Sequence, residues 1–259
     1  MLFEKHSVSC SLQDTVVYFW TLKSEQHESS DAAFRFVPDG FVDWVFHLET
    51  PWKFRFAGQS EIRESNAHVF GHASRYIDLQ LPEQPLSLFG IKFHPWAAHH
   101  IWGDDMFRFT DCFVELADIG QVAIRFLQEQ IHTARNTQQR ILIAEQFLLE
   151  MTDSHPDSRH SPPSFVDSNV GKRRLQQLFK NEIGISPKLF HRTLKINAII
   201  KKMCNAPDEQ LTVLAHHFDY FDQSHFIRDF RHFTNMSPRK FLKSINPSGD
   251  ILNLRVKCS

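Results

Sequence analysis

The segment that most constrains the fold lies near the carboxyl-terminal end, at residues 211–241 (LTVLAHHFDYFDQSHFIRDFRHFTNMSPRKF). Two apolar stripes at helical spacing are separated by the short segment DYFD at residues 219–222. Aspartate tolerates the left-handed conformation that ends a helix, and Asp222 can cap the helix that follows. The pattern predicts two short helices joined by a tight turn, with polar and basic residues on the outer side of the second helix.

The same pattern occurs a second time, fifty-one residues upstream. Residues 175–190 (LQQLFKNEIGISPKLF) overlay residues 226–241 (FIRDFRHFTNMSPRKF), and a Ser-Pro pair that can start a new helix follows in both. Gly184 falls on Asn235, and both residue types accept a positive φ, so they are predicted to end the two equivalent helices in the same way. The chain is therefore predicted to carry a duplicated helix-turn-helix, a motif that places a helix in the major groove of DNA.

These residues resemble the DNA-binding domain of AraC/XylS-type transcription regulators over about residues 165–245. The matching positions of the downstream unit are Ala215, Tyr220, Asp222, Gln223, Ser224, His225, Phe226, Arg228, Phe230, Ser237, Pro238 and Phe241. In that family one long helix joins the two units, and residues 188–204 are expected to form it. Asp219 and Asn235 stand where the family usually has glycine, and the first helix of the upstream unit, expected near residues 163–169, lacks an apolar stripe.

The connecting helix is predicted to bury Leu194 on its apolar face and to end before Pro207. Asp208 is then predicted to cap the next helix.

The resemblance implies double-stranded DNA as the partner, read by the exposed faces of both recognition helices. Glutamine suits adenine and arginine suits guanine, so the residues predicted to contact base edges are Arg173, Gln176, Gln177, Gln223, His225 and Arg228. The predicted phosphate anchors are Lys172, Lys180, Lys188, Arg231 and Arg239, and Arg174 and Ser224 lie on the same faces. For any single residue of this set, the alternative is a solvated surface side chain.

The charges of the chain are divided between its two parts. Residues 164–259 contain 16 Lys and Arg against 8 Asp and Glu, whereas residues 1–163 contain 13 against 22. The whole chain has a net charge of only −1. This division favours a carboxyl-terminal part that meets a polyanion, although segregation of charges onto solvated faces by chance would look the same.

The amino-terminal part is predicted to be mainly strands over residues 1–110, in an antiparallel barrel or sandwich. The strand signals are residues 16–20 (VVYFW), a hairpin over 34–48 with a Pro-Asp-Gly turn, 52–56 (WKFRF), and 86–93 with a bulge or bend at Phe89-Gly90. Residues 38–48, 68–72 and 90–103 resemble the region that precedes some AraC-type DNA-binding domains. That resemblance implies a cupin-like barrel that senses a small molecule or mediates dimerisation.

Residues 112–132 and 137–151 are predicted to be helices, with two open interpretations: contact with a second copy, or packing onto the sheet. Residues 152–164 (TDSHPDSRHSPPS) are polar and rich in proline, which is typical of a linker. The predicted organisation is an α+β chain with a sensor and dimerisation domain at 1–151, a linker at 152–164, and an all-α double helix-turn-helix domain at 165–259.

Other chemistries find little support in the sequence. The spacing of His68, His72, His94, His99 and His100 fits no metal-ligand signature, and neither a nucleophile elbow nor a phosphate-binding glycine loop is present. Four scattered cysteines (Cys10, Cys112, Cys204 and Cys258) and the lack of a long apolar run favour a cytoplasmic protein with reduced thiols. We therefore expect no enzyme activity, no cofactor, no metal and no membrane contact.

The hypothesis is a bacterial transcription regulator of the AraC type that binds specific DNA, meets RNA polymerase, and responds to a small molecule through its amino-terminal domain. A homodimer is possible, and activation and repression both stay open. One alternative is a protein-binding adaptor whose helix-turn-helix pair is degenerate. Another is a nucleic-acid-associated enzyme, which would need a reactive cysteine, but Cys10 and Cys112 have no activating group nearby in sequence.

Overall fold

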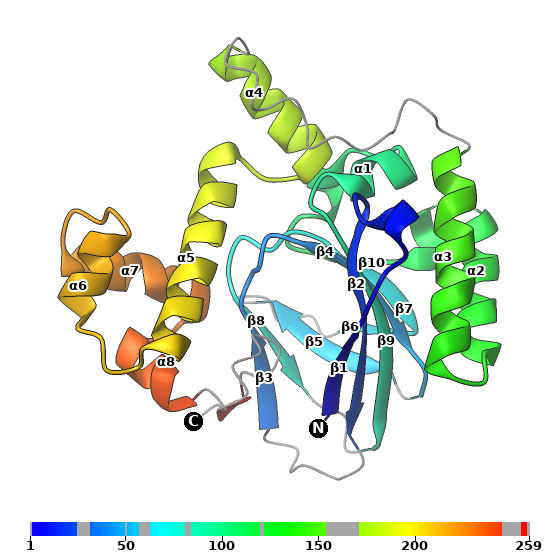
Figure 1. The fold of residues 1–259 in the computed structure, drawn as a ribbon, viewed down its shortest axis with the longest axis horizontal. Helices are drawn as coiled ribbons and strands as arrows, with labels where there is room; N and C mark the ends of the chain where they lie inside the picture. The colour runs from blue at the N-terminus through cyan, green and yellow to red at the C-terminus, as the bar shows by residue number, and fades with distance from the viewer. Residues whose placement is uncertain are drawn as a thin grey trace.

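The computed structural model describes residues 2–24, 32–49, 51–56, 63–80, 84–119, 122–153, 171–244 and 255–257. These residues form a β-rich amino-terminal half and a helical carboxyl-terminal half (Figure 1). The predicted α+β class, with antiparallel strands first and an all-α unit last, is confirmed.

The described strands form two antiparallel sheets. The first has the order β1 (Leu2–His6), β2 (Val16–Ser24), β9 (Leu86–Phe93), β4 (Val42–His47), β7 (Ala67–Phe70) and β10 (Phe113–Glu115). The second has the order β11 (Arg255–Lys257), β3 (Ala32–Phe36), β8 (Ile77–Gln80), β5 (Trp52–Phe56) and β6 (Arg63–Ser65). Since β11 pairs with β3, the end of the chain returns to the amino-terminal half.

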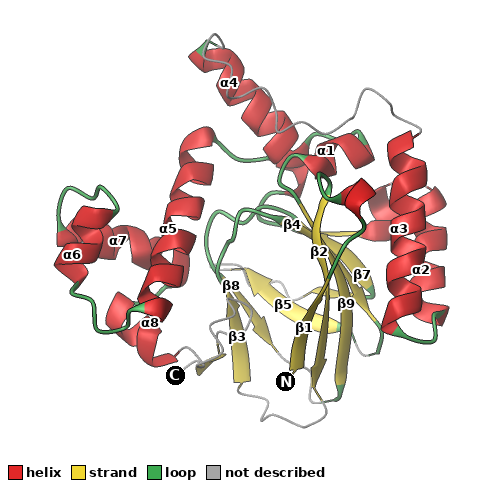
Figure 2. Ribbon diagram, viewed as in Figure 1, coloured by secondary structure: helices red, strands yellow, loops and turns green. Residues whose placement is uncertain are grey.

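The longer helices are α1 (Ala97–Trp102), α2 (Val122–Thr133), α3 (Thr137–Asp153), α4 (Lys172–Leu178), α5 (Pro187–Asn205), α6 (Leu211–His217), α7 (Gln223–Thr234) and α8 (Pro238–Ser244). Short turns of tighter helix occur at η1 (Cys10–Leu12), η2 (Met106–Phe109) and η3 (Leu116–Ile119), and α4 continues into a π-helical turn, η6 (Phe179–Ile183). Figure 2 shows α2 and α3 along one side of the strands, and α5 to α8 as a separate helical group.

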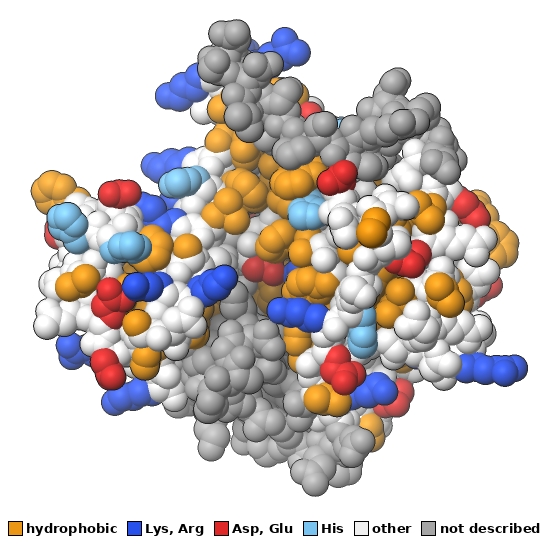
Figure 3. All heavy atoms as spheres, viewed as in Figure 1, with side chains coloured by type: hydrophobic (Ala, Val, Ile, Leu, Met, Phe, Trp, Pro, Cys, Tyr) orange, Lys and Arg blue, Asp and Glu red, His pale blue; other side chains and the backbone are white. Residues whose placement is uncertain are grey.

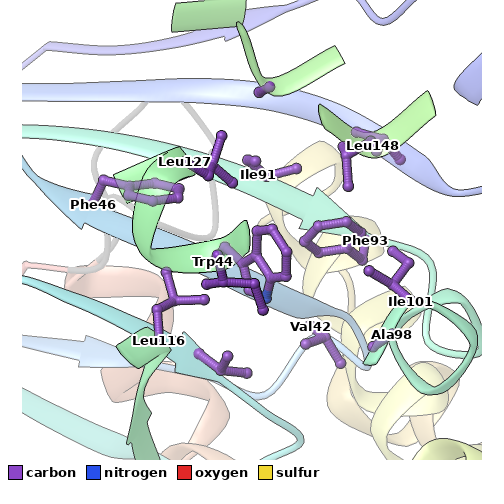
Figure 4. Close-up of a cluster of buried hydrophobic side chains, with 14 of the residues drawn as sticks. Val42, Trp44, Phe46, Ile91, Phe93, Ala98, Ile101, Leu116, Leu127 and Leu148 are labelled. Atoms are coloured by element: carbon purple, nitrogen blue, oxygen red, sulfur yellow. The ribbon is translucent and has the colours of Figure 1, made fainter. Parts of the chain in front are cut away.

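The central strand β4 is buried along its whole length because both faces of the first sheet are covered. Trp44 and Phe46 point toward the helices and pack into one core with Leu127 of α2 and Leu148 of α3 (Figure 4). The alternate residue Val45 packs into a second cluster, formed with residues of β2, β3, β7, β8 and β9. The amino-terminal half therefore has one core under its helices and another between its sheets.

The hairpin expected over residues 34–48 is wrong. β3 lies in the second sheet and β4 in the first, so the Pro38-Asp39-Gly40 turn carries the chain from one sheet to the other. Gly40 has a φ of +87°, which a side-chain-bearing residue adopts only with strain. A turn between two apolar strands looks the same in sequence whether the strands pair or separate, which explains the error.

The bulge expected at Gly90 is also wrong, since this residue pairs in regular register with Trp20 on one side and Val45 on the other. A Cβ atom at Gly90 would lie 1.9 Å from Cε2 of Trp20, so glycine leaves room for the indole ring. The irregularity lies in β2 instead, between Val16 and Tyr18.

The helix predicted over residues 112–132 begins too early. Phe113–Glu115 forms the edge strand β10, which pairs with β7, the short η3 follows at Leu116–Ile119, and the α-helix α2 begins at Val122. The second predicted helix is confirmed as α3, which extends to Asp153 and so includes the first two residues assigned to the linker. The remainder of that linker lies outside the described residues.

The long connecting helix is confirmed as α5, with Ser186 as its N-cap and Pro187 in its first turn. Two details of the prediction are wrong. Leu194 is 42% exposed, because neither helix-turn-helix core reaches its side of α5. Asp208 caps no helix: the N-cap of α6 is Gln210, and its side chain makes no capping hydrogen bond.

Candidate nucleic-acid interface

The downstream helix-turn-helix consists of α6, a four-residue turn and α7. Asp219 has a φ of 52°, as expected of the residue that ends the first helix. Asp222 caps the second, its carboxylate accepting a hydrogen bond of 2.6 Å from the backbone N–H of His225. At the far end Asn235 is left-handed, with a φ of 54°. These turn and cap predictions are confirmed.

α7 is strongly two-sided. Phe226, Phe230 and Phe233 are fully buried, each 0% exposed, and pack against Ile196 and Ile200 of α5. Burial of this aromatic stripe fixes which residues of α7 face the solvent.

The upstream unit presents α4 and η6 as one recognition helix. Phe179 and Ile183 are buried at its inner side, next to Leu189 and Phe190 in the first turn of α5. Gly184 ends the helix with a φ of +99°, which confirms its equivalence to Asn235. The helix expected to precede α4 falls within residues 154–170, outside the described part of the chain.

The predicted DNA-contacting residues are on the surface in both units. Exposed side chains belong to Lys172, Arg173, Arg174, Gln176, Gln177, Lys180, Lys188, Ser224, His225, Arg228, Arg231 and Arg239, and Gln223 is half-buried. Neither Arg173 nor Arg228 faces inward, so each is available to a partner. In Figure 3, Lys and Arg side chains gather over α4 and over the helical group at the left of the view.

The outer face of α7 borders a surface hollow of about 480 Å³. Its lining is Ser224, Ile227, Arg228 and Arg231, which follow one side of the helix at intervals of three to four residues. Two guanidinium groups and a hydroxyl at the rim of an open hollow suit phosphate oxygens and base edges.

Several of the candidate side chains already make contacts within the described part of the protein, among them His225, whose ring centre lies 5.2 Å from that of Tyr220. The ammonium group of Lys180 lies 4.7 Å from the centre of the Phe107 ring, so this side chain contacts the amino-terminal half. Gln177 donates a hydrogen bond of 2.9 Å from Nε2 to Asn181 one turn later. On binding DNA, each of these side chains would have to keep its contact within the protein while also reaching the DNA, or give up that contact for one with the DNA.

A buried network that sequence reasoning missed fixes α7 against α5. Asp229, only 8% exposed, pairs with Arg192 of α5 and accepts a hydrogen bond of 2.8 Å from the Tyr220 hydroxyl. Burial, reinforced by the hydrogen bond to Asp229, raises the pKa of Tyr220, so the hydroxyl stays protonated and donates. Lys195 lies 4.6 Å from the Tyr220 ring. Nothing in the sequence links Arg192 to Asp229, because they are 37 positions apart.

The two recognition helices are separated by the connecting helix. α5 has 19 residues, which at 1.5 Å per residue makes it about 28 Å long. The upstream unit packs on its first turn, and the downstream unit packs on Ile196 to Met203. Figure 1 shows α4 beyond one end of α5, and α6 to α8 beside the rest of it. This length is close to one turn of duplex DNA, about 34 Å.

The amino-terminal half contains buried ionisable groups between its sheets. Lys92, 2% exposed, donates hydrogen bonds of 2.7 Å to both Asp39 and Asp43. Burial acts to lower the pKa of Lys92, but the two carboxylates outweigh it and leave that pKa above its ordinary value. Burial, together with the nearby His47, lowers the pKa of His68 well below its usual range, so this ring is neutral.

Metal-binding groups and membrane-spanning helices are both absent from the described residues. Within the described ranges, no group of three or more His, Cys, Asp or Glu side chains is arranged to hold a metal ion. None of the described helices combines the length and the apolar character needed to cross a membrane.

Two family models match the chain. Residues 5–115 match a domain of unknown function (DUF6597), and residues 167–244 match a helix-turn-helix domain. No curated protein matches.

The chain is similar to several solved structures of ToxT from Vibrio cholerae. An apo variant has 14% identity and a TM-score of 0.45, covering 93% of this chain and 99% of that chain. A structure of ToxT from strain O395 has 9% identity and a TM-score of 0.42, and the match covers 93% of this chain and 97% of that chain. A structure of ToxT bound to (E)-4-(8-methylnaphthalen-1-yl)but-3-enoic acid has 11% identity and a TM-score of 0.42. That match covers 94% of this chain and 99% of that chain. At this level the likeness carries no argument about function.

Proposed function

We propose that this protein is a transcription regulator of the AraC type that binds specific sequences of duplex DNA, and the match of residues 167–244 to a helix-turn-helix domain supports this proposal. The observation that carries the proposal is the outer face of α7. Its polar and basic side chains are exposed, while the Asp222 cap and the buried Asp229 hold the helix in place.

In this proposal the two recognition helices divide the work between base edges and phosphates. Base edges are contacted by Arg173, Gln176, Gln177, Gln223, His225 and Arg228. Phosphates are contacted by Lys172, Arg174, Lys180, Lys188, Ser224, Arg231 and Arg239. Two helices on one rigid connector would enter successive major grooves on one face of the duplex, with bending of the DNA making up any difference in spacing.

The amino-terminal half is proposed to bind a small-molecule effector between its two sheets. The support is the set of buried ionisable side chains there, among them Lys92, Asp43, His47 and His68. Polar groups are costly to bury, and buried ionisable groups with perturbed pKa values cluster at functional sites.

A second copy of the chain is proposed to contact α2 and α3, and RNA polymerase is the proposed partner at promoters. The support for the dimer is that Phe126 of α2 and Leu142 of α3 are large apolar side chains with exposed fractions of 61% and 57%.

The experiment that tests the function is selection of bound sequences from random duplex DNA by the purified full-length protein, with and without a mixture of metabolites. The expected result is a bipartite motif whose two parts lie about one helical turn apart. Recovery of no enriched sequence, or of binding that does not weaken with salt, would instead favour the adaptor interpretation.

A further inference from the structure

The two helix-turn-helix units are equivalent in sequence but not in surroundings. In the upstream unit, Phe179, Ile183 and Ile185 form a buried cluster. The described part of this unit packs against a neighbouring part of the chain.

That neighbour is the amino-terminal half. η6 packs against η2 and α1. The Thr110 hydroxyl donates a hydrogen bond of 2.9 Å to the carbonyl oxygen of Gly184. A Cβ atom at Gly184 would lie 2.6 Å from the carbonyl oxygen of Met106 and 2.8 Å from Oγ1 of Thr110. We call this meeting of Gly184, Met106 and Thr110 the Gly184 contact.

The Gly184 contact explains a difference between the two units. Gly184 and Asn235 hold the same place and are both left-handed, with φ values of +99° and 54°. Asparagine suffices at 235, where the side chain is exposed. At 184 the conformation alone would also accept asparagine, but the Met106 carbonyl leaves no room for a Cβ atom. Glycine at this position is therefore required by the contact between the halves.

The amino-terminal half also holds the connecting helix and the downstream unit. Asn197 of α5 donates a hydrogen bond of 2.7 Å to the Pro38 carbonyl, and Val37 is fully buried in the downstream core. His232 of α7 lies 3.1 Å from the Ser74 carbonyl oxygen. The amino-terminal half thus contacts both units and the helix between them.

We propose that the amino-terminal half sets the separation and angle of the two recognition helices through the Gly184 contact, and so determines which half-site spacing the protein accepts. This inference rests on the proposed function. It assigns Gly184 and Thr110 as positioning residues, which act on DNA through α4 without touching it.

The test measures binding of the full-length protein to duplexes carrying the selected bipartite site with zero, one or two base pairs inserted or removed between its halves. Each base pair rotates one half-site by about 34°. The wild type is expected to prefer one spacing by about tenfold or more, the usual effect of losing one good base contact. Gly184→Asn keeps a left-handed residue but disturbs the contact, and it is expected to reduce that preference to about threefold or less.

Two further variants complete the design. Asn235→Gly is the matched control at the equivalent position of the other unit, and it is expected to keep the wild-type preference. Thr110→Val removes the hydrogen bond with little change of shape, and it is expected to reduce the preference to a smaller extent. If circular dichroism shows that the Gly184→Asn protein is unfolded, the spacing preference of Thr110→Val tests the inference in its place.

An unchanged spacing preference in the folded variants overturns the inference. So does equal loss of affinity at every spacing, since the contact would then support only the fold of the upstream unit. A wild-type protein that binds no duplex would refute the proposed function instead, which keeps the two failures distinct.

Discussion

At the scale of single residues, two phenylalanines of the downstream unit that are nine positions apart in the sequence occupy opposite environments. Phe230 is 0% exposed and Phe221 is 93% exposed. Phenylalanine thus fills the core at position 230, whereas at position 221 its ring faces the solvent from the turn between α6 and α7.

Phe230→Ala is expected to lower the free energy of unfolding by about 3–5 kcal/mol, because it leaves a cavity in a packed core. Phe221→Ala is the matched control, expected to change it by less than about 0.5 kcal/mol. Urea titration followed by circular dichroism measures both. A Phe230→Ala protein as stable as the wild type would remove this residue from the core.

Arg228→Ala is expected to weaken binding to the selected site by about 1–3 kcal/mol, with relaxed preference at one base position. Arg135, an exposed arginine between α2 and α3, provides the control: Arg135→Ala should bind like the wild type. Titration of both variants with the cognate duplex and with duplexes mutated at single base positions measures the affinity and the base preference. Equal affinity of Arg228→Ala and wild type for the cognate duplex would reject the role.

The buried His72 is expected to make the free energy of unfolding depend on pH. Burial lowers its pKa from 6.5 to about 4, and Lys92 adds to this effect while Asp39 opposes it. Between these values the unfolded chain binds more protons than the folded one, so stability falls as the pH drops from about 6.5 to about 4. The shift corresponds to about 3 kcal/mol in total.

The measurement is urea unfolding at pH 7 and pH 5 for the wild type and His72→Asn. The variant is expected to lose less stability between the two pH values, whatever its stability at pH 7. Comparing slopes separates His72 from the buried Asp43, whose pKa is raised by burial and acts in the opposite direction. Equal slopes would show that His72 is charged or accessible in the folded protein.

At the scale of elements, the position of the recognition helix α7 depends on α5 through polar contacts as well as through the aromatic core. Arg192 and Tyr220 both bond to Asp229, which lies on the inner side of α7. A carboxylate at this place orients the helix about its own axis, because its partners come from two different elements.

Asp229→Asn is expected to lower the free energy of unfolding by about 1–3 kcal/mol, as for loss of hydrogen bonds to a charged group. It is also expected to weaken DNA binding, although Asp229 does not face outward. The control is Asp208→Asn, an exposed carboxylate that caps no helix and should change neither quantity. Unaltered DNA affinity in Asp229→Asn would mean that the aromatic core alone orients α7.

At the scale of the whole molecule, the charges are divided between a basic carboxyl-terminal part and an acidic amino-terminal part. The excess of Lys and Arg beyond residue 164 lies on the half that presents α4 and α7, while the excess of Asp and Glu lies in residues 1–163. This division predicts DNA binding with strong dependence on salt.

The logarithm of the binding constant is expected to fall linearly with the logarithm of salt concentration, by about 0.9 for each phosphate contacted. Lys172→Ala and Lys188→Ala should each reduce that slope by about one, with little change in sequence preference. Lys23→Ala, in β2 of the acidic half, should leave the slope unchanged. A wild-type slope near zero would contradict the assignment of phosphate anchors.

Local sequence patterns correctly predicted the helix caps and helix ends of the carboxyl-terminal half. Caps and left-handed helix ends depend on residues adjacent in the chain, so the roles of Asp222, Ser186 and Asn235 follow from their immediate neighbours in the sequence. Strand partners depend on distant segments. The separation of β3 from β4, and the regular pairing of Gly90 against Trp20, therefore could not be read from the sequence.

The sequence by itself determined that two similar helices with polar outer faces, each ended by a left-handed residue and followed by a Ser-Pro pair, lie near the carboxyl-terminal end, because helix period and capping are encoded within a few residues. Only the tertiary structure decided that Asp229 orients α7 and that Gly184 lies against Met106. Both depend on groups brought together from segments far apart in the chain, and such proximity exists only once the chain has folded.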